Sequence, residues 1–369
     1  MGVKVYYYMT VAVLIGGLLF PQKGQRRKTY VILMAALHTF VCGWRYMYLT
    51  GDLRKYAWDY YSIADKGWFS SDVFNGGRNF LFFWLEKAFS MLTDGDFQIF
   101  LIFIAVVIEL AVAVIIYRYS PRPWLSYLCW NCFGFYVFGF SAIKQALAMA
   151  LILASFTGIM EDKPKRFYVL TLLAGCIHAP ALIFLPARVI SRTRLNTKKL
   201  LVYAFSAGLI YLYRDRIVTF VSGFYYDEMD FMEGNRLGIR FAMIVGLIVL
   251  GIVLRGLEGK SFNMLLNLMV VTGVLQMFSG YDNVFTRLTD YYFQFLILYL
   301  PMMLYPEYDE VLPGEKIWHL TLTYRRRIAA ILCAVLLSGL YYYKTNLGVR
   351  ISNSADNFLN YRFCWEVRE

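Results

Sequence analysis

Long apolar runs recur along the whole chain, and short clusters of Lys and Arg separate them. The runs extend over roughly 14–22 residues, about the length that a helix needs to cross a bilayer. Strands of a membrane barrel would need only about 10 residues with strict alternation of apolar and polar positions. The pattern therefore predicts an all-α polytopic membrane protein with about 10 full transmembrane spans.

The basic clusters predict the orientation of these spans, because cytoplasmic loops are enriched in Lys and Arg. A cluster at 23–28 follows the first run, at about 5–20, and we assign it to the cytoplasm. The N-terminus is then outside. We interpret the first run as a span and not as a cleaved signal, because no small-residue cleavage site follows it. The same rule ends the last span, at about 328–343, with the C-terminus outside.

The chain is predicted to be a single integral membrane domain over residues 1–369, since no repeat or low-complexity segment interrupts the apolar pattern. Two polar stretches, at about 45–96 and 214–238, are predicted external loops. The first has balanced acidic and basic residues and many aromatic residues, which favours an external domain or interfacial helices.

The run at 167–190 disturbs the alternation of inside and outside, because basic residues flank it at both ends. A single span cannot have both ends on one side of the membrane. His178 and Pro180 lie in the middle of this run, and Pro interrupts a helix because it lacks a backbone N–H. We therefore expect a re-entrant helical hairpin with His178 at its tip, on the external side, where non-helical backbone is buried in protein or lines a wet cavity.

Composition supports a membrane protein. Of the 369 residues, 59% are hydrophobic, above the ~45–50% of a soluble domain. The formal net charge of +12 would favour nucleic-acid binding in a soluble protein. Here the topology explains it, with attraction to anionic headgroups or to a phosphate-bearing lipid as a second interpretation. Cys129 and Cys132 have the spacing of a zinc or redox pair, but without a second ligand pair we interpret them as packing thiols.

Several polar residues that are far apart in the sequence share the external face on this topology. They are Arg45, Asp52, Tyr56, Lys144, Gln145, His178 and Arg287. Ionisable groups in or beside apolar runs are costly in lipid, so each is a candidate functional residue. Arg and Lys can bind phosphate oxygens, and a neutral His or an Asp can accept a proton from an attacking hydroxyl. This set suits transfer from a phosphate-activated donor.

A purely structural role is open for each of these residues. Arg45 and Lys144 could be interfacial anchors whose long side chains reach the headgroups. His178 and Gln145 could form hydrogen bonds between helices. Asp52 could pair with nearby cations, and Arg287 with nearby carboxylates.

Other chemistry is absent from the sequence. It contains no Ser-His-Asp motif, no paired-Asp motif, no Gly-rich phosphate loop and no metal-ligand cluster, so we expect neither a metal nor a cofactor. Asp227, Glu228 and Asp230 are interpreted as a solvated loop. Glu109 lies within an apolar run, and both a functional and a helix-packing role are open for it.

The order and spacing of the polar motifs resemble the EpsG family of exopolysaccharide proteins, which is similar to the Wzy-type polysaccharide polymerases. The resemblance covers nearly the whole chain. Its motifs are Arg45-Tyr, Gly51-Asp52 with Tyr56, Lys144-Gln145-Ala-Leu-Ala, His178-Ala-Pro-Ala-Leu-Ile-Phe-Leu-Pro186, Arg287 before an aromatic span, and the closing Asn360-Tyr-Arg-Phe-Cys-Trp365.

This chain departs from the family pattern at two of these motifs. The family usually has Arg-Gln where this chain has Lys144-Gln145, and Gly-Thr-Asp where it has Thr50-Gly51-Asp52. Lys144 keeps the positive charge but lacks the bidentate fork of an Arg.

The resemblance implies a metal-independent polymerase at the outer face of a bacterial cytoplasmic membrane. It would join oligosaccharide repeat units, carried on undecaprenyl pyrophosphate, into exopolysaccharide or capsule. Its partners would be the bilayer, the lipid-linked oligosaccharide and polysaccharide export and chain-length proteins, with no nucleic acid.

On this hypothesis the candidate residues divide into three groups. Arg45 and Lys144, with Arg287, would bind the pyrophosphate. Asp52 or His178 would be the catalytic base, and Gln145 and Tyr56 would position the substrate.

Two other functions remain open from the sequence. A membrane acyltransferase that decorates cell-surface polysaccharide would use His178 as its base. A transporter of lipid-linked sugars would need a charged cavity through the membrane, and the chain shows no internal repeat of the kind that alternating access uses.

Overall fold

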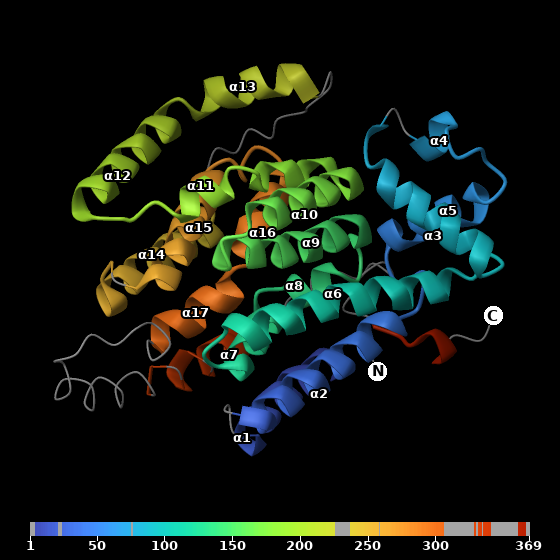
Figure 1. Ribbon diagram of the computed structural model, residues 1–369, viewed down its shortest axis with the longest axis horizontal. Coiled ribbons are helices and arrows are strands. Elements are labelled where there is room, and N and C mark those ends of the chain that lie inside the picture. The colour runs from blue at the N-terminus through green and yellow to red at the C-terminus, as the bar shows by residue number, and fades with distance from the viewer. Residues whose placement is uncertain are drawn as a thin grey trace. The chain divides into compact units, whose positions relative to one another are not determined.

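The computed structural model describes residues 4–20, 24–74, 77–225, 237–257, 259–305, 328–329, 331–333, 335–340 and 361–366. These residues form helices joined by turns, with one isolated antiparallel bridge between Arg45 and Phe363 (Figure 1). The predicted all-α class is confirmed. The acidic run at 227–230 and residues 330, 334 and 341–343 of the last predicted span lie outside the described residues.

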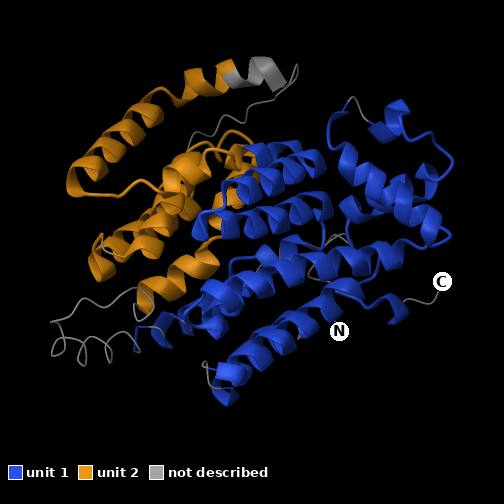
Figure 2. Ribbon diagram, viewed as in Figure 1, with its two compact units in different colours: residues 1–182, 313–369 blue, residues 183–312 orange. Residues whose placement is uncertain are grey.

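The chain packs into two compact units (Figure 2). Unit 1 comprises residues 1–182 and 313–369, and unit 2 comprises residues 183–312. The division into compact units does not test the single membrane domain expected from the sequence, which stays a prediction.

The helices of unit 1 follow the chain from the N-terminus to the first part of the predicted hairpin. They are α1 (Lys4–Leu19), α2 (Gly24–Gly43), α3 (Gly51–Ile63), α4 (Ser71–Phe74), α5 (Phe80–Leu92), α6 (Phe97–Tyr119), α7 (Pro123–Cys132), α8 (Phe135–Phe138), α9 (Ile143–Met160) and α10 (Pro164–Ile177). The predicted loop at 45–96 therefore contains α3, α4 and α5, in keeping with the interfacial helices that the sequence left open.

Unit 2 contains helices of 5 to 17 residues, and the helix at 296–304 is buried along its whole length. Its helices are α11 (Ala187–Ser191), α12 (Thr197–Leu212), α13 (Arg214–Tyr225), α14 (Ile239–Arg255), α15 (Lys260–Gln276), α16 (Asn283–Phe293) and α17 (Leu296–Leu304). The predicted external loop at 214–238 begins with the helix α13, and its external position stays a prediction. Val218 packs there against Phe278 and Tyr281, and burial of such apolar side chains stabilises the helix.

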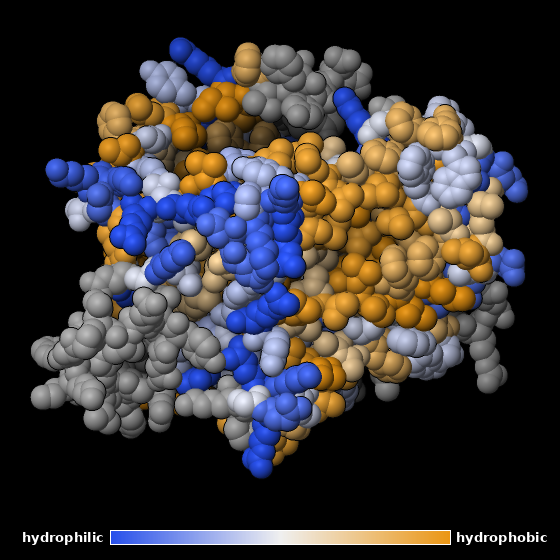
Figure 3. Space-filling view, in the orientation of Figure 1, coloured by the Kyte–Doolittle hydropathy of each residue, from blue (hydrophilic) through white to orange (hydrophobic). Residues whose placement is uncertain are grey.

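Two helices of unit 1, α6 and α9, are long and apolar enough to cross a membrane. Shorter apolar helices occur as well, and Figure 3 shows broad areas of apolar side chains on the surface. On α10, for example, Val169 is 55% exposed and Leu172 is 51% exposed. Apolar side chains in such number at the surface are typical of helices that face lipid. The count of about 10 spans and the positions of both termini stay predictions.

Helices α9 and α10 of unit 1 form an antiparallel pair, with α6 packed against α9. The two helices approach closely at Gly158, where an added Cβ would lie 2.6 Å from the backbone nitrogen of Phe167. Close helix packing of this kind needs small residues at the contact. The arrangement places the start of α9 and the end of α10 at the same end of the pair.

The turn between α9 and α10 is organised by the carboxylate of Glu161. It accepts hydrogen bonds from Lys163 Nζ (2.8 Å) and Arg166 Nη1 (2.9 Å), next to it in the chain. It also accepts from Arg118 Nη1 (2.8 Å) and Tyr119 Oη (3.1 Å) at the end of α6. The hydrogen bond from Lys163 is the main reason that the pKa of Glu161 falls to about 2.

The helical run at 167–190 is broken where the sequence predicts. Helix α10 ends at Ile177, His178 is extended (φ −147°, ψ 103°), and Ala179–Phe184 forms a 3-10 helix. Leu182 folds back onto α10, where its Cγ would lie 2.7 Å from a Cβ added to Gly175. The second arm of the hairpin is thus a 3-10 helix followed by the short α11, and re-entry into the membrane stays a prediction.

We expect Gly158→Ala to destabilise the protein by about 1–3 kcal/mol. The added methyl group would clash with the backbone nitrogen of Phe167, and backbone cannot move away as a flexible side chain can. Gly208→Ala is the matched control, since nothing lies within 4 Å of the corresponding position on α12. That change should stabilise by up to about 1 kcal/mol, from helix propensity. Thermal unfolding of the purified variants in detergent measures both, and equal unfolding midpoints would contradict the close packing of α9 and α10.

The turn at Glu161 predicts a pH dependence of stability. Because the folded pKa, about 2, lies below the ordinary value of 4.5, the stabilisation is complete above pH 4.5 and is lost as pH falls towards 2. Glu161→Gln should therefore lower the unfolding midpoint at neutral pH and have little effect near pH 2. The groups are largely exposed, so we expect a modest change. An unfolding midpoint that is the same for both proteins at neutral pH would exclude this role.

Candidate functional site

Lys144 lies in the first turn of α9, and aromatic rings surround its ammonium group. The Nζ atom is 4.6 Å from the ring centroid of Phe83, 5.2 Å from that of Phe82 and 5.7 Å from that of Tyr56. The negative faces of such rings attract a cation, most strongly where water is excluded. The predicted pair Lys144 and Tyr56 is thus in contact, and α3 and α5 supply the rings.

Asp52 is held beside this group at the start of α3. Thr50 caps the helix by accepting a hydrogen bond from Leu53 N (3.2 Å). Ser141 Oγ donates to Asp52 Oδ2 (3.2 Å) and lies 3.1 Å from Thr50 Oγ1. Ser141 comes three residues before Lys144, and the Asp52 side chain is exposed. The start of α3 and the start of α9 therefore present a carboxylate and an ammonium group from neighbouring positions.

Arg45 is buried and hydrogen-bonded to backbone, so its guanidinium group is not open to an anion. Its side chain is 0% exposed. The guanidinium donates hydrogen bonds to the carbonyl groups of Cys42, Gly139 (3.4 Å) and Phe140 (3.2 Å), and it lies over the Phe140 ring. These contacts fix the turn that leads into α9. The structure thus gives Arg45 backbone acceptors in place of the phosphate oxygens that we predicted for it.

His178 lies at the same end of the α9 and α10 pair as Lys144. It is half-buried at the end of α10, and the next residue, Ala179, donates its backbone N–H to Asn79 Oδ1 (2.8 Å). Asn79 precedes α5, the helix that places Phe82 and Phe83 around Lys144. Helix α5 packs against both α3 and α10, so it connects the His178 corner with the Lys144 group.

Two predicted residues are not part of this group. Gln145 is buried on the inner face of α9, where its Nε2 lies 4.0 Å from Met149 Sδ. Arg287 is exposed on α16, in unit 2. Asp290, a carboxylate three residues further along the chain, forms an ion pair with Arg240. The roles of Gln145 and Arg287 stay predictions.

Sequence reasoning missed Glu86 on α5. Its side chain is 0% exposed, and within the described part of the chain neither carboxyl oxygen has a hydrogen-bond partner. Burial raises the pKa of Glu86 well above its usual range, and the nearby charge of Lys144 acts in the opposite direction. The available signal was its spacing: Glu86 follows Phe82 and Phe83 by one helical turn.

Glu109 has a packing partner within the helices of unit 1. It is 1% exposed on α6 and accepts a hydrogen bond from Trp130 Nε1 (3.3 Å) on α7. Nearby, His38 Nε2 lies 3.0 Å from Asn131 Oδ1. These buried bonds join α2, α6 and α7, which is the helix-packing role that the sequence left open for Glu109.

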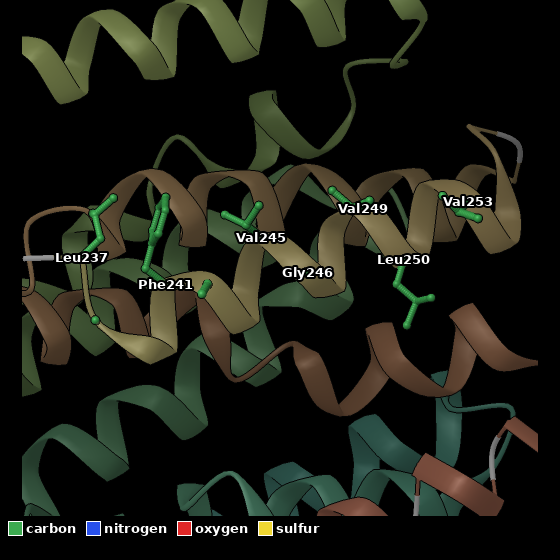
Figure 4. Close-up of a pocket in the computed structure, with 9 residues that line it drawn as sticks. Leu237, Phe241, Val245, Gly246, Val249, Leu250 and Val253 are labelled. Atoms are coloured by element: carbon green, nitrogen blue, oxygen red, sulfur yellow. The ribbon is translucent and has the colours of Figure 1, made fainter.

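Unit 2 contains an open groove of about 730 Å³ along α14 (Figure 4). Leu237, Phe241, Val245, Val249 and Val253 line it, among other apolar residues and glycines. The lining carries no ionisable side chain, so the groove offers apolar contact without the charged groups of the Lys144 region.

The apolar helices, with a carboxylate and an ammonium group at one end of α9 and α10, are typical of a helical membrane protein with a polar site. The EpsG family model matches residues 28–363, so the chain belongs to the EpsG family. This membership supports an exopolysaccharide-related membrane protein. No curated protein and no solved structure matches the chain.

We expect Asn79→Ala to weaken the link between α5 and the His178 corner. Asn79 has a left-handed backbone (φ 57°) and accepts the hydrogen bond from Ala179 N. Alanine loses the acceptor and tolerates this backbone poorly, which together costs about 2 kcal/mol. Asn79→Asp keeps both features and should behave almost like the unchanged protein. Thermal unfolding compares the two, and equal losses of stability in both variants would refute the link.

Proposed function

We propose that this protein is a membrane glycosyltransferase that polymerises oligosaccharide repeat units linked to undecaprenyl pyrophosphate, at the outer face of the cytoplasmic membrane. The observation that supports this most directly is the Lys144 ammonium within the rings of Tyr56, Phe82 and Phe83. The Asp52 carboxylate is tied to the chain just before α9, the helix of Lys144, by the hydrogen bond from Ser141. Family membership supports the link to exopolysaccharide.

Lys144 is suited to bind the leaving pyrophosphate. No direct ion pair between Lys144 and a carboxylate occurs among the described residues, so its ammonium group can donate to phosphate oxygens. It lies in the first turn of α9, and no side chain caps that end of the helix. The backbone N–H groups and the helix dipole there add positive potential beside the lysine.

Asp52 is suited to accept the proton of the incoming sugar. Its carboxylate is exposed and is held by Ser141. In the proposed step, a hydroxyl of the incoming unit loses its proton to Asp52 and forms a bond with the anomeric carbon of the growing chain. The bond from that carbon to the pyrophosphate oxygen breaks, and its electron pair leaves with the pyrophosphate beside Lys144. His178 is the second candidate for this base.

Arg45 supports this site from behind, because its hydrogen bonds hold the Gly139–Phe140 turn that precedes α9. We therefore assign it a positioning role, with direct pyrophosphate contact left to Lys144. Tyr56 orients the ammonium group, and Gln145 and Arg287 keep the positioning and pyrophosphate-binding roles expected from the sequence.

Lys144→Ala should reduce long-chain polymer by at least about 100-fold, as expected when a charge that stabilises a leaving group is removed. Single repeat units on lipid should accumulate. Lys144→Arg keeps the charge and should retain polymer, whereas Arg45→Ala should lose polymer because the turn before α9 is no longer held.

The measurement is polymer length and lipid-linked material in a deletion strain that expresses each variant. Lys198→Ala, at an exposed cation on α12 in unit 2, is the control. Normal polymer length in Lys144→Ala, at a normal level of protein in the membrane, would refute the proposed function.

A further inference from the structure

The segment 361–366 pairs with the chain that leaves α2. Tyr46 N donates a hydrogen bond to the carbonyl group of Arg362 (2.8 Å), and Cys364 N donates to that of Trp44 (2.9 Å). These two bonds flank the isolated antiparallel bridge of the described residues. Backbone pairing of this kind fixes one register between two stretches of chain. The segment belongs to unit 1, and the proposed function gives it no role.

Tyr361 begins this segment and is 0% exposed. Its hydroxyl group donates a hydrogen bond to the carbonyl group of Val41 (2.8 Å). Val41 lies in the last turn of α2, and the last four carbonyl groups of a helix have no partner within that helix. Arg45 donates to the next carbonyl group along, that of Cys42. Tyr361 and Arg45 therefore close the end of α2 together.

The ring of Tyr361 packs against two other buried rings. Its centroid lies 5.9 Å from that of Phe140, in the turn before α9, and 6.2 Å from that of Tyr6, on α1. The Tyr6 and Phe140 centroids are 5.9 Å apart, and all three residues are 0% exposed. The guanidinium group of Arg45 lies over the Phe140 ring, at 5.7 Å. Aromatic pairs stabilise a fold beyond the burial of their area, so Tyr361 holds the turn before α9 through its ring.

These contacts join the two stretches of chain that lead to the candidate groups. From the end of α2 the chain runs through Tyr46 to Asp52, at the start of α3. Phe140 is followed by Ser141, which donates a hydrogen bond to Asp52 (3.2 Å), and three residues after Ser141 by Lys144. A shift of Phe140 relative to the end of α2 would therefore move the ammonium group relative to the carboxylate.

We propose that Tyr361 is a positioning residue: it fixes the end of α2 against the turn before α9 and thereby sets the Asp52 carboxylate relative to the Lys144 ammonium group. The proposal rests on the proposed function for the reaction that these groups perform. The contacts themselves come from the described residues of unit 1. Placement matters because a displacement of about 1 Å can lower the rate of a reaction by about 100-fold.

The first experiment measures the local opening of these two stretches without any substrate. Purified full-length protein in lipid nanodiscs is exchanged into deuterated buffer, and deuterium uptake is followed by mass spectrometry of its peptides. In Tyr361→Ala, peptides that cover 44–50 and 139–146 should exchange at least about tenfold faster, since the packing that holds them is lost. A peptide across 157–167, at the turn between α9 and α10, should be unchanged.

Two variants separate the contacts of Tyr361. Tyr361→Phe keeps the ring and loses the hydroxyl group, so exchange should rise at 44–50 and stay unchanged at 139–146. Arg362→Ala changes the exposed side chain next to Tyr361 and should alter neither peptide.

Unchanged exchange in Tyr361→Ala would overturn the proposal. An equal rise in all three peptides would overturn it as well, because that result shows general destabilisation. If Tyr361→Ala does not fold, Tyr361→Leu replaces it in the same comparison, since leucine keeps a buried apolar side chain and removes the ring.

The second experiment measures the steady-state rate of polymer synthesis from a lipid-linked repeat unit. Tyr361→Ala should lower kcat by about 10- to 100-fold with little change in KM, because the reacting groups are misaligned while the other contacts with sugar and lipid are kept. Tyr361→Phe should lower kcat less, because its ring still holds Phe140. A raised KM at unchanged kcat, or the same kcat in both variants, would contradict the proposal.

The two experiments fail separately. If the unchanged protein makes no polymer, the proposed function fails. The exchange measurement then still decides whether Tyr361 holds the two stretches of chain together.

Discussion

The close antiparallel contact between α9 and α10 is the constraint on which the candidate site depends. It requires a residue without a side chain at Gly158, because the backbone of α10 lies where a Cβ would be. The contact sets the start of α9 and the end of α10 at one end of the pair. Lys144 and His178 therefore lie at the end of the pair opposite the turn, whereas the close contact at Gly158 lies beside the turn, far from either residue.

Three cations of unit 1, Arg45, Lys87 and Lys144, lie at least partly away from bulk water, and each is stabilised there by different partners. Arg45 donates to backbone carbonyl groups, and Lys87 donates to the carbonyl groups at the end of α3. Lys144 instead has aromatic faces around it. The partners of Arg45 and Lys87 use the hydrogen-bond donors of the cation, and those of Lys144 leave them available. This difference supports the proposal that Lys144 is the cation that binds the ligand.

Much of this arrangement was predictable from periodicity and topology. The apolar runs indicated an all-α protein, and the conflict of basic flanks together with Pro180 located the break at His178. The grouping of Lys144 with Tyr56 and Asp52 followed from the expectation that these positions share one face. Each of these inferences depends on local chemistry or on simple rules for helices.

The remaining features depend on tertiary contacts that a single sequence does not show. Whether Arg45 faces phosphate or backbone is decided by where the Gly139–Phe140 turn lies. Glu86 resembled an ordinary charge in a polar stretch, and only the packing of α5 against its neighbours makes it buried. The helix at 214–225 is stabilised by the packing of Val218 against Phe278 and Tyr281.

The central claim is that this protein joins lipid-linked repeat units and releases the lipid pyrophosphate. It is tested most directly by incubating the purified protein in nanodiscs with a single undecaprenyl-pyrophosphate-linked repeat unit and measuring chain length together with free undecaprenyl pyrophosphate. We predict chains of several units, with one molecule of lipid pyrophosphate released for each bond formed. Unchanged single units, with no lipid pyrophosphate released, from folded protein would contradict this account.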